Sequence, residues 1–403
     1  MDVPQKILLI SVNEGMVAMS REVLSEVMIQ LNAVCAADQI SVVALARQEA
    51  LEKSEWPPAL GAAGFEHKVT VAEESATQLM LFSRPGVALN VLDSFSTGSP
   101  NIEAKAVHHK GGAIAVVQLS GGQSCCIGSF HLDGNLSDRR EANLSSAVLR
   151  ATGRGRAAAQ PWRPDVCLFM GDMNFTIQPQ ADAATTASSL PGLPELFQEA
   201  VQSLQGSTKQ NDTAELAPEV LKALQRELGG TRTRDAVMLR CDGCPTSVEV
   251  LADDVLRDTL HDGTKEPRLT QGEAEISRLT LHPMPKGSLP TYRLCSGDGS
   301  AQASLVAAAG KGSSGVTPLL ADANLAEDLI KQLYFSDKKA GVLKKRGNMV
   351  RLNLGWLDRL YVGTNGASKP SIEQTCPLLL RDAEGKCLDH ALMAWLVSFE
   401  TQS

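Results

Sequence analysis

Short, mainly apolar runs constrain the fold of this chain more than any other feature of its sequence. They lie at residues 6–12, 40–46, 113–119, 125–130 and 166–170, and a polar residue follows each of them within two positions. Runs of this length are typical of buried β-strands. Between the first two, residues 20–35 carry apolar side chains at the three- and four-residue spacing of an amphipathic helix. Strands that alternate with a helix indicate a layered α/β core.

Composition supports a large globular core and restricts the class of partner. The 403 residues are 43% hydrophobic and 21% charged, a balance that excludes a disordered or fibrous protein. The net charge of −8 argues against bulk nucleic-acid binding, so we expect no nucleic-acid partner. The sequence has neither an apolar run of membrane-spanning length nor signal-peptide features, and its nine cysteines are interpreted mainly as reduced thiols. We therefore expect a cytoplasmic protein.

The middle of the chain differs from both ends. From Gln178 to about Gly287 it is polar and rich in Ala, Ser, Thr and Gln, and strand-like segments return at 288–294, 356–362 and 390–399. We therefore expect a single domain over residues 1–403 with a helical and polar insertion at about 178–287. Within the insertion, Cys241 and Cys244 have the spacing of zinc ligands. Because no second pair lies at a suitable distance in the sequence, a turn with two thiols is favoured over a zinc site.

Polar residues suited to acid–base, metal-binding or phosphate-binding chemistry stand at the ends of the predicted strands. In chain order they are Asn13, Glu49, His131, Asp172, Asn174, Asp358, Asp389 and His390. Any one of them alone fits a helix cap, a turn or a hydrogen-bonded core residue. An α/β fold, however, collects its ligands and catalysts at strand ends, so the ordered set predicts one functional site.

The order of these residues resembles the endonuclease/exonuclease/phosphatase superfamily, and within it the inositol polyphosphate 5-phosphatases. Leu45-Ala46-Arg47-Gln48-Glu49 is similar to the family's Gly-Leu-Gln-Glu, and Gly171-Asp172-Met173-Asn174-Phe175 is similar to its Gly-Asp-Leu-Asn-Tyr. Further segments that match in order are Ser11–Asn13, Lys110–Ala113, Ser129–Leu132 and Arg139–Asn143.

Three later segments favour the 5-phosphatases over the nucleases of this superfamily. Pro290-Thr291-Tyr292-Arg293 resembles the family's Pro-Thr-Tyr-Lys. Lys344-Lys345-Arg346 followed by Trp356-Leu357-Asp358-Arg359 resembles its Lys-Lys-Arg and Trp-Cys-Asp-Arg. Asp389-His390 resembles the end of its closing Ser-Asp-His.

The resemblance implies a fold, an activity and a cofactor. The fold is the four-layer α/β sandwich of the endonuclease/exonuclease/phosphatase type, with two packed, mostly antiparallel sheets flanked by helices. The activity is Mg²⁺-dependent hydrolysis of the 5-phosphate of inositol polyphosphates or phosphoinositides. Mg²⁺ takes oxygen ligands and keeps several waters, so one carboxylate can anchor it. The resemblance gives this role to Glu49 with help from Asn13, while Asp389 either contacts the metal or caps an element.

The resemblance also implies catalytic roles for five residues. Asp172 orients or deprotonates the attacking water, and Asn174 holds the scissile phosphate. His131 and His390 donate hydrogen bonds to phosphoryl oxygens. Asp358 orients His390 and favours its charged form, as in other acid–histidine pairs.

Basic residues are expected to recognise the phosphates that are not cleaved. The resemblance assigns substrate binding to Lys110, Arg140, Tyr292, Arg293, Lys345 and Arg346. Residues 338–351 contain six cations and no acid. This segment is either a solvated face or, as we favour, a contact with a polyanionic head group or an anionic membrane. The expected partners are therefore an inositol phosphate or phosphoinositide substrate and an anionic membrane, which the protein would contact peripherally.

Several departures from the family pattern keep two alternatives open. Val12 replaces a Trp, Gly15 stands where relatives often have Asn or Asp, and Thr176 replaces an Arg. Arg293 replaces a Lys, and Phe130 stands before His131 where the family has Ser. The alternatives are a metal-dependent nuclease or other phosphodiesterase, and a pseudo-phosphatase that binds phosphoinositides or a protein partner. The insertion is either a docking arm for an unidentified protein or a surface elaboration.

Overall fold

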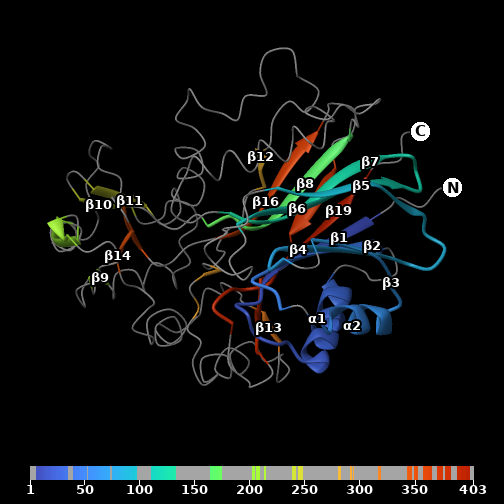
Figure 1. Cartoon of the computed structure of the whole chain (residues 1–403), viewed down its shortest axis with the longest axis horizontal. Helices are drawn as coiled ribbons and strands as arrows, with labels where there is room; N and C mark the ends of the chain where they lie inside the picture. The colour runs from blue at the N-terminus through green and yellow to red at the C-terminus, as the bar shows by residue number, and fades with distance from the viewer. Residues whose placement is uncertain are drawn as a thin grey trace, which may run out of the picture.

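Two six-stranded sheets carry the core, and two helices cover one of them (Figure 1). The computed structural model describes residues 6–34, 40–51, 53–72, 75–97, 110–132, 164–174, 202–204, 206–208, 213–214, 238–241, 244–247, 280–282, 291–292, 294, 316–318, 343–346, 349–352, 357–364, 370–374, 377–382 and 388–399.

Both sheets are mixed and mostly antiparallel. The first has the order β17-β19-β1-β2-β4-β3, made of β1 (Lys6–Asn13), β2 (Ile40–Gln48), β3 (Glu66–Val71), β4 (Gln78–Ser83), β17 (Ser371–Gln374) and β19 (Met393–Ser398). The second has the order β12-β16-β8-β7-β6-β5, made of β5 (Leu89–Thr97), β6 (Gly111–Leu119), β7 (Ser124–His131), β8 (Val166–Asp172), β12 (Thr280–Leu281) and β16 (Asp358–Thr364). The central pairs β1–β2 and β7–β8 are parallel, whereas the other described neighbours are antiparallel. The predicted α/β fold class with two such sheets is confirmed.

The alternation of side chains along β1 shows how the layers pack. Leu8, Ile10 and Val12 pack against the helices α1 (Arg21–Val34) and α2 (Trp56–Ala62). Ile7 and Leu9 point the other way and contact the inner face of the second sheet. Because successive side chains of a strand lie on opposite faces, β1 is buried on both sides. This explains why its sequence is a continuous apolar run.

Three strands extend beyond the apolar runs that predicted them. β2 ends at Gln48 rather than Ala46, β7 ends at His131, and β8 ends at Asp172 rather than Met170. Gln48, His131 and Asp172 are at most 2% exposed, so the polar residues belong to the buried part of the strands. The polar residues that follow the apolar runs therefore belong to a polar layer inside the sandwich and do not mark where the strands end.

The outer face of the second sheet packs around Phe130. Its ring centroid lies 5.0 Å from that of Phe169, and a Cβ built on Gly112 or Gly128 would lie 2.5 or 2.7 Å from ring carbons of Phe130. Gly171 meets the backbone of the same residue: it has φ +140°, and a Cβ would lie 2.0 Å from the Phe130 carbonyl oxygen. Glycine is therefore required where β8 approaches β7.

Three cysteines of the second sheet are buried free thiols. They are Cys125, Cys126 and Cys167, and burial raises the pKa of the Cys125 and Cys126 thiols. A raised pKa suppresses the reactive thiolate. These three cysteines are therefore buried, unreactive thiols.

The remaining described strands form smaller sheets. They are β9 (Thr213–Ala214), β10 (Met238–Cys241), β11 (Cys244–Ser247), β13 (Val316–Pro318), β14 (Leu343–Arg346), β15 (Met349–Leu352) and β18 (Leu378–Leu380). Cys241 and Cys244 pair in register at the end of the β10–β11 hairpin. Most of the predicted insertion at 178–287 lies outside the described residues. Neither described helix is long and apolar enough to cross a membrane.

Candidate active site

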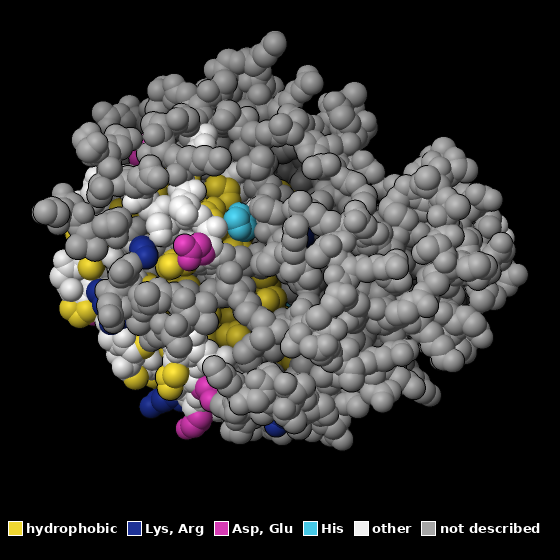
Figure 2. Space-filling view, turned by 180° about the vertical axis from the view of Figure 1, so that it is seen from behind, with side chains coloured by type: hydrophobic (Ala, Val, Ile, Leu, Met, Phe, Trp, Pro, Cys, Tyr) yellow, Lys and Arg dark blue, Asp and Glu magenta, His cyan; other side chains and the backbone are white. Residues whose placement is uncertain are grey.

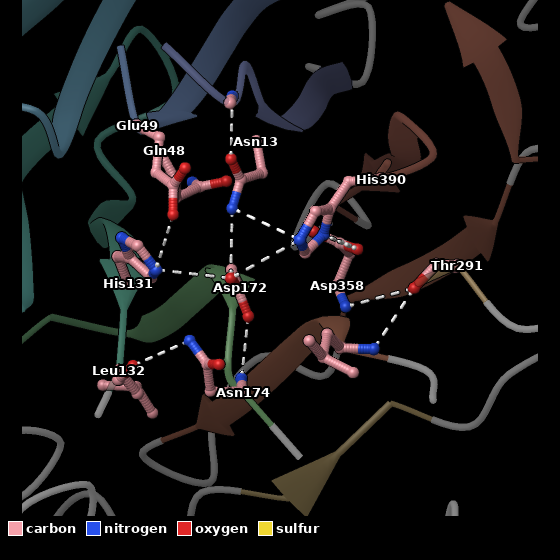
Figure 3. A network of polar contacts seen from close by, with 12 residues as sticks. Asn13, Gln48, Glu49, His131, Leu132, Asp172, Asn174, Thr291, Asp358 and His390 are labelled. Atoms are coloured by element: carbon pink, nitrogen blue, oxygen red, sulfur yellow. Dashed lines mark hydrogen bonds and ion pairs between the residues drawn. The ribbon is translucent and has the colours of Figure 1, made fainter. Parts of the chain in front are cut away.

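A polar layer closes one end of the space between the two sheets. The alternation that turns Leu9 of β1 and Leu168 of β8 inward also turns inward the last residues of the central strands. Neighbouring strands place these residues in register, with Asn13 beside Gln48 and with Asp172 between His131 and Asp358. The strand ends that the sequence singled out therefore meet in one buried cluster (Figure 3).

Asp172 lies at the centre of this cluster. Its Oδ2 accepts a hydrogen bond from Asn13 Nδ2 at 3.1 Å and lies 3.4 Å from His131 Nε2. Its Oδ1 accepts a hydrogen bond from the backbone N–H of Asn174 at 2.9 Å. Burial alone would raise the pKa of Asp172, but His131 and the charge of His390, 3.9 Å away, hold that pKa well below its usual range. Asp172 is therefore an ionised carboxylate inside the protein.

His390 forms a buried acid–histidine pair with Asp358. Its Nδ1 lies 3.0 Å from Asp358 Oδ2, and its Nε2 points toward Asn13 Nδ2 at 3.4 Å (Figure 3). Burial disfavours charge on the imidazole, but the Asp358 and Asp172 carboxylates outweigh it and raise the pKa of His390 to about 10. Burial also raises the pKa of Asp358, and the His390 charge opposes that rise. His390 is therefore charged at neutral pH and presents its Nε2–H to the site.

Thr291 holds this pair in place and was not singled out as a site residue from the sequence. Its side-chain oxygen accepts hydrogen bonds from the backbone N–H groups of Leu357 and Asp358, at 3.2 and 3.4 Å. The sequence signal for Thr291 was its place in Pro290-Thr291-Tyr292-Arg293. The Tyr292 ring packs against that of His390, with ring centroids 4.5 Å apart and the planes tilted by 40°.

We predict that Thr291→Val lowers the free energy of unfolding by about 1–3 kcal/mol, because two buried N–H groups lose their acceptor. Urea unfolding of both proteins measures the difference. Thr97→Val is the matched control, since the buried Thr97 hydroxyl has no hydrogen-bond partner among the described residues. Equal losses in the two variants would contradict the assigned role of Thr291.

His131 lies between the buried Asp172 and the partly exposed Glu49, which marks the open side of the site. Its Nε2 contacts Lys110 Nζ and lies 3.7 Å from Glu49 Oε1. Burial, followed by the nearby Lys110 charge, lowers the pKa of His131, so this imidazole is neutral. Asn174 lies below it and donates its side-chain N–H to the Leu132 carbonyl at 2.9 Å.

The oxygen donors of the site fit a hard divalent cation. The Glu49 side chain is 32% exposed, Asn13 Oδ1 accepts the Gly15 N–H at 3.0 Å, and Asp389 Oδ1 lies beside Gly15. Among the described residues, no group of three or more His, Cys, Asp or Glu side chains is arranged to hold a metal. Mg²⁺ does not require such a group, because it keeps several waters. The described carboxylates here also outnumber the cations, since Glu49, Asp172, Asp358 and Asp389 face Lys110 and His390.

The structure does not bring every predicted substrate-binding residue to this site. Lys345 and Arg346 lie on β14, in a three-stranded sheet with β9 and β15, and Figure 1 shows β14 well apart from β8 and β16. Arg140 and Arg293 lie outside the described residues. Figure 2, which views the molecule from behind Figure 1, shows basic, acidic and His side chains among the described residues of that side and no large basic patch among them.

Together these features define a two-sheet α/β sandwich with a buried acid–histidine site at one end of its central strands. The sequence matches no known protein-family profile and no curated protein.

Among solved structures, the chain is similar to the inositol polyphosphate 5-phosphatase domain of SPsynaptojanin in complex with inositol (1,4)-bisphosphate and calcium, at 11% identity over 98% of this chain and 83% of that one, with a TM-score of 0.47. It is also similar to Cimex nitrophorin, at 11% identity over 99% and 100% of the two chains and a TM-score of 0.42. The human nocturnin catalytic domain has 10% identity over 99% and 96%, with a TM-score of 0.35. At these scores the three structures assign neither a family nor a substrate to this chain.

Proposed function

We propose that this site hydrolyses phosphate esters with the help of a divalent cation. The observation that carries the proposal is the ionised Asp172 carboxylate, which accepts a hydrogen bond from Asn13 Nδ2 and lies 3.4 Å from His131 Nε2 and 3.9 Å from the charged His390. Hydrolysis of a phosphate ester needs hydrogen-bond donors and an acceptor. The donors bind the phosphoryl oxygens, and the acceptor orients the attacking water.

Asp172 is the group that orients the attacking water. It accepts a hydrogen bond from the water and draws the proton away as the new O–P bond forms and the ester O–P bond breaks, and the leaving alkoxide takes up a proton from solvent. Its low pKa keeps it ionised before the reaction and favours orientation over permanent protonation. His390 and Lys110 offer positive N–H groups to the phosphoryl oxygens, and Asp358 fixes the ring of His390.

Mg²⁺ is the proposed cofactor, with Glu49 as its anchor and Asn13 and Asp389 nearby. When bound, it would offset negative charge on the phosphoryl oxygens. The exposed fraction of Glu49 supports this role, since a carboxylate at the open side of the site is accessible to a hydrated cation.

The proposed substrates are 5-phosphorylated inositol polyphosphates or phosphoinositides. This finer proposal is supported by the Pro-Thr-Tyr-Arg segment, whose Tyr292 ring packs against that of His390. A cytoplasmic protein that binds anionic membranes peripherally fits such a substrate.

We predict that phosphate release requires Mg²⁺ and is confined to 5-phosphorylated compounds. The measurement compares soluble inositol 1,4,5-trisphosphate with phosphatidylinositol 4,5-bisphosphate in vesicles, each with Mg²⁺ and with excess chelator. Inositol 1,4-bisphosphate is the matched control, because it lacks the phosphate to be cleaved. Plasmid nicking without release from these substrates would indicate the nuclease instead. Vesicle binding without turnover would indicate the pseudo-phosphatase.

A further inference from the structure

A buried ion pair lies directly behind the candidate metal ligands, on the helix-facing side of the first sheet. Arg47 Nε and Nη2 each donate to a separate oxygen of Glu14 at 2.8 Å, and the two side chains are 1% and 3% exposed. Trp56 Nε1 donates to Glu14 Oε1 at 3.1 Å, and Arg47 Nη1 donates to Gln78 Oε1. We call Glu14, Arg47, Trp56 and Gln78 the charged clamp.

Stability alone does not account for the charged clamp. Removing two charges from water costs about as much as their attraction returns, so well-packed apolar side chains serve equally well in most cores. On the same strand, Ile40, Val43 and Leu45 belong to the apolar cluster on this helix-facing side. Buried ion pairs are better explained where they select one geometry among several.

The backbone next to the charged clamp is strained, so it needs an interaction that holds it in this one conformation. Glu49 has φ 48° and Met16 has φ 61°, values that residues other than glycine rarely adopt. The two loops that contain them are joined, because Met16 N–H donates to the Glu49 carbonyl and Glu14 N–H to the Gln48 carbonyl, both at 2.8 Å. Arg47 Nη2 reaches past this turn to the Leu51 carbonyl at 3.2 Å. The clamp therefore holds both ends of the strained segment.

We propose that the charged clamp positions Asn13 and Glu49 for binding of a divalent cation. Glu14 directly follows Asn13, and Arg47 lies two residues before Glu49, so the ion pair sets the distance between the two loops. Glu14 and Arg47 are positioning residues, because their side chains are buried, pair with each other and act through Asn13 and Glu49. The cation-binding part of this inference rests on the proposed function, whereas the ordering of the loops does not.

The test replaces both charges together with Glu14→Leu/Arg47→Met. An apolar pair of similar volume avoids an unpaired buried charge, so the variant is expected to unfold cooperatively like the wild type. Hydrogen exchange followed by mass spectrometry is expected to be at least ten-fold faster in peptides covering 13–17 and 48–51, and unchanged in β6. The affinity for Mn²⁺ alone, measured by electron paramagnetic resonance, is expected to fall about ten-fold or more.

Two controls separate this effect from general damage. Arg21→Gln breaks another Arg–Glu pair, Arg21–Glu55, whose side chains are 58% and 46% exposed, and is expected to change neither measurement. Glu49→Gln is expected to lose Mn²⁺ affinity while its loops exchange at the wild-type rate. If the double variant fails to fold, Arg47→Lys replaces it. That change keeps the charge but cannot form the two parallel hydrogen bonds, so both measurements should move in the same direction.

The outcomes distinguish this inference from the proposed function. Unchanged exchange in the two loops would overturn the inference whatever the metal does. Faster exchange with unchanged Mn²⁺ affinity would overturn it as well. If the wild type binds no Mn²⁺ while the variant loops exchange faster, the ordering of the loops stands and the proposed function fails.

Discussion

Asp172→Asn is expected to lower kcat/KM for phosphate release by about 10³-fold. The amide keeps the shape of the carboxylate and can still accept the Asn174 N–H, so the fold is expected to survive. It loses the negative charge that orients water, and it lowers the charge opposite His390, 3.9 Å away. Initial rates with Mg²⁺, on protein whose thermal unfolding is checked in parallel, measure the loss.

Asp165→Asn is the matched control for this prediction. Asp165 stands immediately before β8, at the opposite end of the strand from Asp172, and accepts hydrogen bonds from Ser124. Its replacement is expected to leave kcat/KM at the wild-type value. Comparable turnover by Asp172→Asn and the wild type would show that Asp172 takes no part in the reaction.

Gly171→Ala is expected to destabilise the protein by about 4 kcal/mol or more, which is the range of the most damaging single substitutions. The new methyl group would lie 2.0 Å from the Phe130 carbonyl oxygen and 2.8 Å from its nitrogen, at a backbone φ of +140°. Both atoms belong to the backbone of the neighbouring strand, so only separation of β7 from β8 relieves the clash. Urea unfolding measures the loss, and failure to accumulate folded protein is its extreme form.

Two comparisons keep the glycine prediction informative when that variant does not fold. Gly121→Ala places a methyl group in open space and is expected to match the wild type. Gly112→Ala clashes with the Phe130 ring, so Phe130→Leu is expected to restore part of its stability. Stable Gly171→Ala protein would contradict the close approach of the two strands.

The sequence predicted the strands and the grouping of the site well, because both depend on local patterns. Where both faces of a strand are buried, the strand can be recognised in the sequence as an apolar run with a polar residue at its end. Asn13, His131 and Asp172 were assigned to strand ends for this reason, and the structure places Asp172 Oδ2 3.1 Å from Asn13 Nδ2 and 3.4 Å from His131 Nε2.

The parts that were missed depend on contacts between distant segments. β2 was predicted to end at Ala46, whereas the strand continues through Arg47, whose buried guanidinium pairs with Glu14, 33 residues earlier. Thr291 gains its role from backbone groups 66 and 67 residues further along. A charged residue or a threonine gives the same local signal on a surface as in such a network.

The pairing of β1 has a consequence for how the protein is made. β1 lies between β2 and β19, and its Asn13 reaches Asp172 and His390, which are 159 and 377 residues further along the chain. During translation one edge of β1 therefore stays unpaired until the ribosome has produced β19. An open apolar edge is a template for misassembly, and contacts of such long sequence separation form slowly. Nascent chains halted before Met393 should consequently be inactive and should depend on chaperones, because the site and the sheet are completed in the same late step.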